Sequence, residues 1–404
     1  MFKSIYLVFL LYALLLIGFF LNADPNGGAF NDYQNHIFLL NDLKINLINT
    51  IFDYDKYNTR HSPILYIFIS FFYKLNFSDQ LIRFISVHLC LLLPLIFYKS
   101  LLLKYKNINK NCILLFAGLV FLSPSFWSLS IWPDSRIFGL IFFCLSIFYF
   151  LKFENEDHFK NAIKCIFAYT IASYISPNFA VFSIYFFYFF YKKFNFSKKI
   201  FYIIIINIAL SAPAIIYLFS LDTIFLFTTA VPSKSIENLD FLNISNKILI
   251  ISSLIFFYAI PFLLTKSIMI NFKNLKIAII SIFITLFLAI NFNYNFDYTG
   301  GGIFYKISYY LFKNNILFFI ICVFSFIFNL SLFNTDRKNL FLVILLILSN
   351  PQYTIYHKYY DPFLLILFTL IFNLNLNTKK LFNYKSVIIF YIYASLFLIF
   401  NFIK

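Results

Sequence analysis

The chain has 404 residues, of which 62% are hydrophobic and 12% are charged, and its mean hydropathy is +0.83. A soluble domain is about half apolar and about a quarter charged. This composition therefore excludes a soluble domain and indicates an integral membrane protein. The formal net charge of +16 does not indicate a nucleic-acid partner, because basic residues of membrane proteins gather in cytoplasmic loops.

Apolar runs long enough to cross about 30 Å of hydrocarbon recur from one end of the chain to the other. Because lipid offers no partners for backbone polar groups, we expect these runs to be the helices of an all-α polytopic protein. We predict about 13 spans, at residues 5–21, 84–103, 112–131, 137–151, 163–176, 178–191, 200–219, 247–264, 277–291, 316–332, 340–350, 362–376 and 387–403. The five cysteines lie in or beside these runs and are expected to be buried. Residues 1–404 are predicted to form a single membrane domain.

The charges orient these spans. With the N-terminus inside, the Lys-rich segments form short inner loops, and most acidic residues fall in the longer outer loops. This asymmetry follows the positive-inside rule. The polar loops that could carry chemistry are therefore predicted to face outward.

The first outer loop contains two apolar segments. Residues 62–75 are short for a full crossing. Residues 30–51 place one roughly helical stripe of apolar side chains, made of Phe30, Ile37, Phe38, Leu40, Leu43, Leu47 and Ile51. We predict an interfacial helix for each segment, because a crossing at 62–75 would turn the Lys-rich loops outward. Whether residues 62–75 cross the membrane or lie in the loop stays open.

Asp32 is the first candidate for catalysis. It follows the first predicted span, in Gly27-Gly28-Ala29-Phe30-Asn31-Asp32-Tyr33. A carboxylate at the membrane surface can take the proton of an acceptor hydroxyl during sugar transfer. The alternative is structural, because Asn31 or Asp32 could cap the helix that follows.

Arg60, His61 and Arg83 would place positive charge at the outer surface. A departing phosphate gains negative charge, which fixed cations stabilise. Pro63 starts the next helix and so sets where Arg60 and His61 point. The alternative for Arg83 is an interfacial side chain that extends toward lipid headgroups. His36 is expected to take no part.

A second acid–base pair, Asp134 and Arg136, lies in the outer turn before the fourth predicted span. Asp134 is a second catalytic carboxylate, a metal ligand or a helix N-cap, and these three alternatives stay open. Arg136 is a candidate for substrate binding.

Two later loops carry further candidates. His357 and Lys358 could contact phosphate, and Asp361-Pro362 is typical of a helix start. The loop 291–315, with three consecutive glycines at 300–302, is either a substrate lid or a connector. No nucleotide-binding, zinc-protease or nucleophile-elbow motif is present, which argues against a nucleotide-driven pump, a dehydrogenase and a zinc protease.

The order of these elements resembles the C-type (GT-C) superfamily of polytopic glycosyltransferases, closest to the family 39-like branch of protein O-mannosyltransferases and aminoarabinose transferases. In that branch an acidic residue in the first outer loop precedes surface helices and a His-Pro-Pro-Leu-Tyr-Tyr-like motif, similar here to His61-Ser62-Pro63-Ile64-Leu65-Tyr66. An Arg at the outer end of the next span is similar to Arg83, and an Asp that opens a later span is similar to Asp134. The late loop keeps Pro362 but lacks the leading Arg of the branch, and Asn31-Asp32 replaces an Asp-Glu pair.

The resemblance covers chiefly residues 1–200 and the late loop. It implies a GT-C catalytic module in residues 1–200, followed by further transmembrane helices in residues 201–404. It also implies an inverting transfer of a hexosyl or pentosyl group from a polyprenyl-phosphate sugar, with Asp32 as the general base. The reaction would take place on the periplasmic face of a bacterial inner membrane, as part of cell-envelope glycosylation. The acceptor would be a glycan, a lipid or a protein, and no cofactor, metal or nucleic acid is expected.

Two other classes of function stay open. An O-antigen-polymerase-like enzyme is also polytopic, but its large basic loops usually come later in the chain. A lipid or glycolipid transporter would place ionisable residues inside its spans, whereas the predicted spans carry almost no charge.

Overall fold

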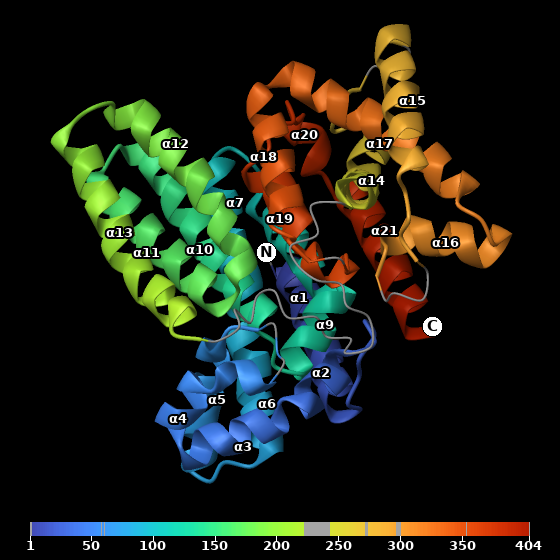
Figure 1. The fold of residues 1–404 in the computed structure, drawn as a ribbon. Coiled ribbons are helices and arrows are strands. Elements are labelled where there is room, and N and C mark those ends of the chain that lie inside the picture. Colours follow the sequence, from blue (N-terminus) through green and yellow to red (C-terminus); the bar gives the residue numbers. More distant parts are fainter. Residues whose placement is uncertain are drawn as a thin grey trace. The chain divides into compact units, whose positions relative to one another are not determined.

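The computed structural model describes residues 2–57, 59, 61–221, 243–270, 274–295, 300–352 and 354–403. Every regular element in these ranges is a helix, as the composition predicts (Figure 1). The chain folds as two compact units. Residues 1–106, 113–238 and 396–404 form unit 1, and residues 107–112 and 239–395 form unit 2.

Within the described ranges, six helical segments are long and apolar enough to cross a membrane. They are α6 (Asp79–Cys90) continued by α7 (Leu92–Lys104), α10 (Ser135–Glu156), α13 (Lys198–Phe219), α14 (Ile244–Leu264), α17 (Ile316–Thr335) and α21 (Tyr384–Ile403). A seventh is possible if α8 (Lys110–Gly118), η2 (Leu119–Leu122) and α9 (Pro124–Ile131), which bend by 65° at their break, count as one span. The protein is therefore all-helical and suited to a lipid bilayer, and the remaining predicted crossings stay predictions.

The largest bundle of unit 1 is built around α10. This helix packs against α7 and α11 (Phe159–Ile175), while η3 (Pro177–Phe182) leads into α12 (Ser183–Phe194). Phe143 stacks on Phe179 with ring centres 4.8 Å apart, and Phe150 contacts Phe186 at 5.3 Å. Such buried aromatic pairs each add about 0.5–1.5 kcal/mol beyond the burial of their area. These contacts fix α10 within the bundle.

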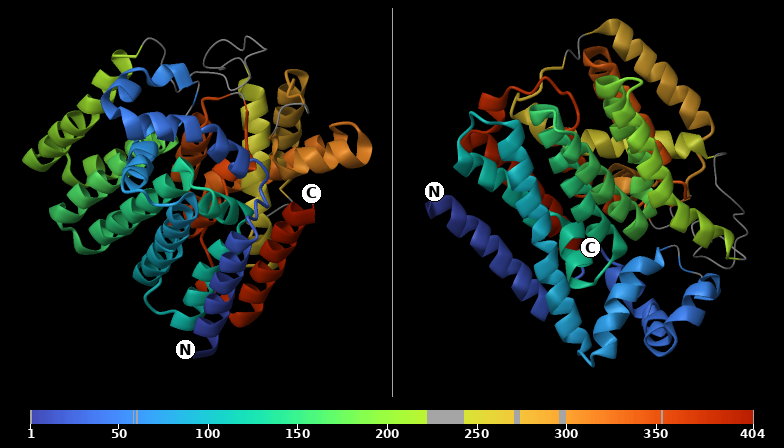
Figure 2. Two further views of the ribbon diagram at one scale, coloured as in Figure 1. Left: turned by 90° about the horizontal axis from the view of Figure 1, so that it is seen from below. Right: turned by 90° about the vertical axis from the view of Figure 1, so that its left-hand side faces the viewer.

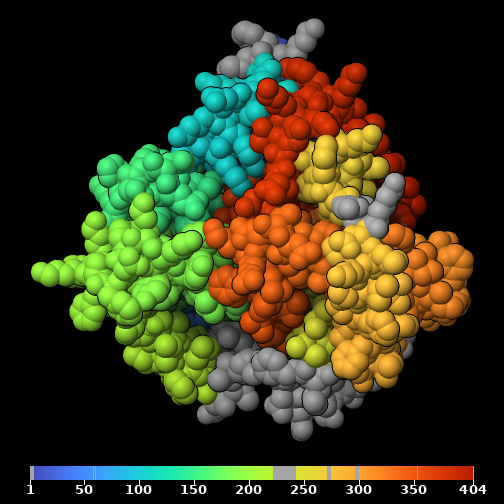
Figure 3. All heavy atoms as spheres, turned by 90° about the horizontal axis from the view of Figure 1, so that it is seen from above, coloured from blue at the N-terminus to red at the C-terminus, as the bar shows by residue number. Residues whose placement is uncertain are grey.

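The helix α13 presents an apolar surface. In the space-filling view of Figure 3, α12 and α13, in light green, form part of the outer surface of unit 1. Phe201, Ile208, Ile216 and Phe219 of α13 are exposed. A helix that exposes large apolar side chains along its length is typical of contact with lipid.

The segment that the sequence predicts as the first outer loop forms a group of short helices: α2 (Ala29–Asn35), α3 (Ile37–Ile45), α4 (Leu47–Phe52), η1 (Tyr54–Tyr57) and α5 (Pro63–Lys74). They gather with α6 at one end of unit 1 (Figure 1). The single helix predicted over residues 30–51 is wrong, because the chain breaks at His36 and again at Asn46. The Asn46 side chain accepts a hydrogen bond from the backbone N–H of Asn49 at 3.3 Å and starts α4. The helix α5 begins at Pro63, as predicted, and Ser62 is its N-cap.

The helix α1 (Phe2–Phe20) runs beside α6, as the turned views in Figure 2 show. The Tyr12 hydroxyl and His88 Nε2 are hydrogen-bonded at 2.8 Å. Gly18 permits close packing on α9, because a Cβ atom there would come within 2.6 Å of the Trp127 ring. These contacts fix the point at which the chain enters the first outer loop.

In unit 2, α14 is the central helix. It packs against α15 (Leu275–Ile290), α16 (Gly302–Phe312), α17, α18 (Arg337–Leu348) and α19 (Phe363–Leu370), and α20 (Thr378–Leu381) precedes α21. The η5 turn (His357–Tyr359) leads to α19, whose N-cap is Pro362, so the predicted helix start at Asp361-Pro362 is confirmed. All five cysteines are buried, as predicted.

Candidate functional site

The start of α2 is fixed by Asp24. Its carboxylate accepts hydrogen bonds from the backbone N–H groups of Gly27 (3.2 Å), Gly28 (2.9 Å) and Phe30 (3.0 Å). Gly28 is the N-cap and has a φ of 118°, a conformation that favours glycine. Asp32 lies within the first turn of α2 and is half-buried. The helix-cap alternative is therefore wrong for Asp32.

His36 joins α2 to two other segments. Its Nδ1–H donates to the backbone oxygen of Asp32, since a carbonyl oxygen can only accept. In the neutral ring, Nε2 then accepts from the Thr59 hydroxyl at 2.9 Å. The ring also stacks on Tyr66 of α5, with ring centres 4.5 Å apart, and meets His61 edge-on at 5.2 Å. His36 thus lies among the candidate residues, where the sequence did not predict it.

His61 links the first outer loop to the start of α10. Its Nδ1 is hydrogen-bonded to Ser135 Oγ at 2.8 Å. Its backbone oxygen accepts a hydrogen bond from the Tyr54 hydroxyl at 2.8 Å. The neighbouring Ser62 hydroxyl donates to the backbone oxygen of Tyr174 in α11. These bonds bring the predicted residues at 61 and 134–136 together.

Two carboxylates act on the His61 ring. Burial lowers the pKa of His61 from its usual 6.5 to about 3, with the charge of Arg136 adding to this effect and those of Asp134 and Asp32 opposing it. The ring is therefore neutral near pH 7, and the positive charge expected at this position is absent. A neutral His61 can exchange hydrogen bonds there, and its predicted role in phosphate binding stays a prediction.

The same charges act on Tyr66. Burial raises the pKa of Tyr66 well above its usual value, Asp134 and Asp32 raise it further, and Arg136 lowers it. Both His61 and Tyr66 therefore lie within electrostatic range of the two carboxylates. The contacts connect the two segments: His36 holds the Asp32 backbone oxygen, its ring lies 5.2 Å from that of His61, and His61 is bonded to Ser135, next to Asp134.

Asp134 is the N-cap of α10. Its Oδ1 accepts a hydrogen bond from the backbone N–H of Arg136 at 2.8 Å, and the residue is 4% exposed. The cap, one of the three alternatives for this residue, is therefore present. Capping is compatible with an ionised carboxylate, because the positive end of the helix dipole stabilises negative charge. Asp134 can accordingly serve the fold and the electrostatics of the site together.

Arg83 is held inside unit 1. Its Nε donates to the backbone oxygen of Ile131 at 3.1 Å, and its Nη2 donates to Asn22 Oδ1 at 2.8 Å. The guanidinium carbon lies 3.4 Å from the centre of the Trp132 ring, and the residue is 6% exposed. The alternative of a side chain extending to lipid headgroups is therefore wrong. Arg83 fastens the turn that leads to Asp134.

The remaining predicted cations are dispersed. Arg60 lies outside the described residues. Arg136, which is half-buried, is the predicted cation beside the two carboxylates of unit 1. His357 and Lys358 belong to unit 2, so they are described separately.

In unit 2, His357 ends a short chain of hydrogen bonds. The Tyr258 hydroxyl donates to Asp361 Oδ1 at 2.6 Å, so it accepts from His357 Nε2–H at 3.0 Å. Asp361 is 5% exposed. The Nζ of Lys358 lies 5.4 Å from the centre of the Tyr356 ring. These two hydrogen bonds fix the orientation of the His357 imidazole.

The loop with glycines 300–302 is hydrogen-bonded to Ile355, just before the η5 turn. The backbone N–H of Gly301 donates to the backbone oxygen of Ile355 at 2.9 Å. The Tyr294 hydroxyl accepts a hydrogen bond from the backbone N–H of Ile355 at 3.3 Å. Residues 296–299 of the loop lie outside the described residues, and the choice between a lid and a connector stays open.

Acidification is expected to destabilise unit 1 through His61. Folding lowers the pKa of His61 from 6.5 to about 3, so the unfolded chain binds more protons between these values. The stability contributed by the neutral ring is complete above pH 6.5 and is lost as the pH falls toward 3, by at most about 1.4 kcal/mol per pH unit. The variant His61→Gln should flatten the decrease in apparent melting temperature between about pH 7 and about pH 4.5.

The matched control for this measurement is His158→Gln, because His158 is exposed. It should keep the wild-type pH dependence when both variants are melted in the same detergent. A slope in His61→Gln equal to that of the wild type would show that His61 does not titrate as described.

Comparisons with known proteins were made at the level of family, sequence and structure. No protein-family model, no curated protein and no solved structure matches this chain.

Proposed function

We propose that this protein is a membrane glycosyltransferase that moves a sugar from a polyprenyl-phosphate donor to an acceptor hydroxyl. The observation that supports this most is the series of contacts from the Asp32 backbone through His36 and His61 to Ser135, which lies between Asp134 and Arg136. This cluster adjoins the first turn of α10, a helix apolar enough to cross a membrane. A donor with an isoprenoid tail and a phosphate needs such a polar group next to lipid.

Asp32 is the general base of the proposed reaction. It accepts the proton of the acceptor hydroxyl as the hydroxyl oxygen attacks the anomeric carbon of the donor sugar. The bond between that carbon and the phosphate oxygen breaks on the opposite face, and the polyprenyl phosphate leaves with the electron pair. The configuration at the anomeric carbon is therefore inverted. The half-buried position of Asp32 suits this role, because the base must reach a substrate.

The leaving phosphate requires positive charge. Arg136 is the proposed cation for it, because an arginine can offer two parallel N–H donors to a phosphate. Arg60, next to His61 in sequence, is proposed to contribute in the same way. Arg83 is proposed to act indirectly, by holding the turn that carries Asp134. His357 and Lys358 are proposed to bind a phosphate in unit 2.

The finer architecture belongs to the same proposal. We infer a GT-C-like arrangement in which the first outer loop lies on the periplasmic surface of a bacterial inner membrane. The exposed apolar side chains of Phe38, Ile45 and Phe52 support a surface position for α3 and α4. The helix α5 has 12 residues and is about 18 Å long, too short to cross the hydrocarbon core.

The test of this function is donor consumption by the purified protein in liposomes. The probe is a radiolabelled polyprenyl-phosphate hexose, incubated with an acceptor fraction from bacterial envelopes. Chromatography should reveal free polyprenyl phosphate and a labelled acceptor. The nucleotide sugar of the same hexose, as the matched control, should not be consumed. An unchanged lipid donor, or use of the nucleotide sugar instead, would overturn the proposal.

A further inference from the structure

The carboxylate of Asp79 ties α2 to the start of α6. Tyr33, next to Asp32 on α2, donates its hydroxyl hydrogen to Asp79 Oδ1 at 2.6 Å. Tyr73, at the end of α5, donates to the same oxygen at 2.9 Å, and the two hydroxyl oxygens are 3.2 Å apart. Two helices of the first outer loop, α2 and α5, therefore meet the start of α6 at one carboxylate oxygen.

The Tyr33 side chain is enclosed by protein. The residue is 2% exposed, and its ring lies 6.0 Å from the Trp132 ring, which in turn packs against Arg83. Burial raises the pKa of Tyr33 far above its usual value, and Asp79 raises it further. The hydroxyl consequently stays protonated and remains a hydrogen-bond donor at any physiological pH.

The helix α2 depends on such contacts for its orientation. It has seven residues, and helices this short are not stable by themselves. The His36 ring donates to the Asp32 backbone oxygen and accepts a hydrogen bond from Thr59. The next residue after Asp32, Tyr33, donates to Asp79. The position of the Asp32 carboxylate is thus determined by its neighbours.

We propose that Tyr33 is a positioning residue for Asp32 and that Asp79 is its anchor. This inference rests on the proposed function, in which Asp32 is the general base. A base must lie within hydrogen-bond reach of the hydroxyl whose proton it takes. A misplacement of about 1 Å can cost up to about 100-fold in rate. Loosening α2 therefore slows the chemical step without weakening the binding of the donor.

The experiment compares Tyr33→Phe with Tyr73→Phe. Each variant removes one hydroxyl from the same Asp79 oxygen and keeps the aromatic ring, but only Tyr33 lies on α2. For Tyr33→Phe, kcat should fall about 10- to 100-fold, while KM for the polyprenyl-phosphate hexose changes less than about twofold. Tyr73→Phe should keep kcat within about threefold of the wild type. Equal losses in the two variants, or a loss in KM alone, would overturn the inference.

Hydrogen–deuterium exchange separates this inference from the proposed function. The backbone amides of residues 29–35 should exchange faster in Tyr33→Phe than in Tyr73→Phe, whether or not the sugar donor is used. If the wild type consumes no donor but this difference is present, the proposed function fails and the anchoring of α2 stands. If the amides of both variants exchange like those of the wild type, the anchoring itself is wrong.

Discussion

Replacing Asp32 with asparagine is expected to lower the rate of sugar transfer about 100- to 10,000-fold, which is the usual contribution of a general base. Asparagine has nearly the same shape as aspartate but does not accept a proton at neutral pH. The first N–H groups of α2 are bonded to Asp24 and not to Asp32, so the helix should form normally in the variant. The affinity for the donor should change little, because the proposed contacts to phosphate come from cations. Initial rates in liposomes, with the protein amount matched by quantitative blotting, give the measurement.

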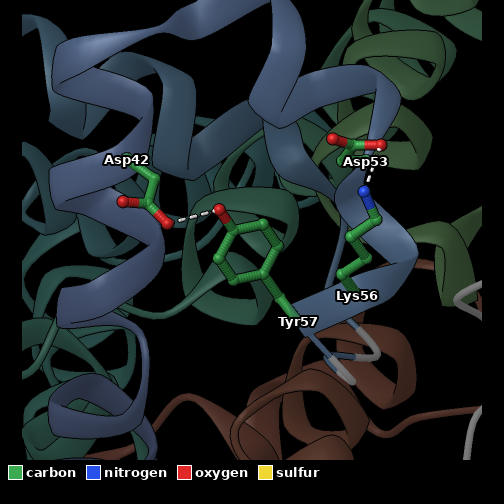
Figure 4. A network of polar contacts seen from close by, with 4 residues as sticks. All are labelled: Asp42, Asp53, Lys56 and Tyr57. Atoms are coloured by element: carbon green, nitrogen blue, oxygen red, sulfur yellow. Dashed lines mark hydrogen bonds and ion pairs between the residues drawn. The ribbon is translucent and has the colours of Figure 1, made fainter.

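The matched control is Asp53→Asn, in the same outer loop. Figure 4 shows Asp53 paired with Lys56, at 2.7 Å between Oδ1 and Nζ, and Asp42 accepting a hydrogen bond from Tyr57 at 2.5 Å. The pair of Asp53 and Lys56 is exposed, and exposed pairs contribute about 0–1 kcal/mol. The control should therefore transfer sugar at nearly the wild-type rate. If Asp32→Asn were as active as this control, Asp32 would have no part in the chemistry.

Replacing Arg83 with methionine is expected to lower the free energy of unfolding by about 3–5 kcal/mol. The change keeps much of the side-chain volume but removes the donors to Ile131 and Asn22, and it uncovers the Trp132 ring. A buried acceptor without its donor costs about 1–3 kcal/mol, and the loss of a buried cation–π contact adds about 2 kcal/mol. The apparent melting temperature in detergent is the measurement.

The variant Arg83→Lys supplies the comparison for this result. It keeps the positive charge but lacks the planar guanidinium that donates in two directions over an aromatic ring. It should therefore melt between the wild type and Arg83→Met. Melting of Arg83→Met at the wild-type temperature would mean that the buried contacts of Arg83 do not stabilise unit 1.

The elements that could be predicted from the sequence are those governed by local rules. A serine before Pro63 and an aspartate before Ser135 are N-cap patterns, and α5 and α10 begin at these positions. Long apolar runs form helices. Such a segment prefers lipid because of its own composition, and in lipid its backbone polar groups must pair within the segment.

The elements that could not be predicted depend on partners far away in sequence. His36 lies four residues after Asp32, a spacing that puts both on one side of a helix, but nothing in the sequence announces Thr59 and Tyr66 as its partners. The sequence suggests that His61 is a surface cation. Its neutral state results from burial beside His36 and the start of α10, which lie far from it in the sequence. Arg83 likewise reads as an interfacial residue, because its stacking on Trp132 arises from the fold.

The length of α10 would set the depth of its first turn in a bilayer. At 22 residues it is about 33 Å long, close to the thickness of the hydrocarbon layer, and Asp134 and Arg136 lie at its first turn. A stiff rod of this length couples acyl-chain length to the level of its leading end. In a thicker bilayer the first turn of α10, with its carboxylate, would lie at the headgroup boundary or within the hydrocarbon core. In a thinner bilayer it would lie in the aqueous phase. If α10 spans the membrane as we propose, the composition of the lipid would therefore control the hydration of the Asp134 carboxylate.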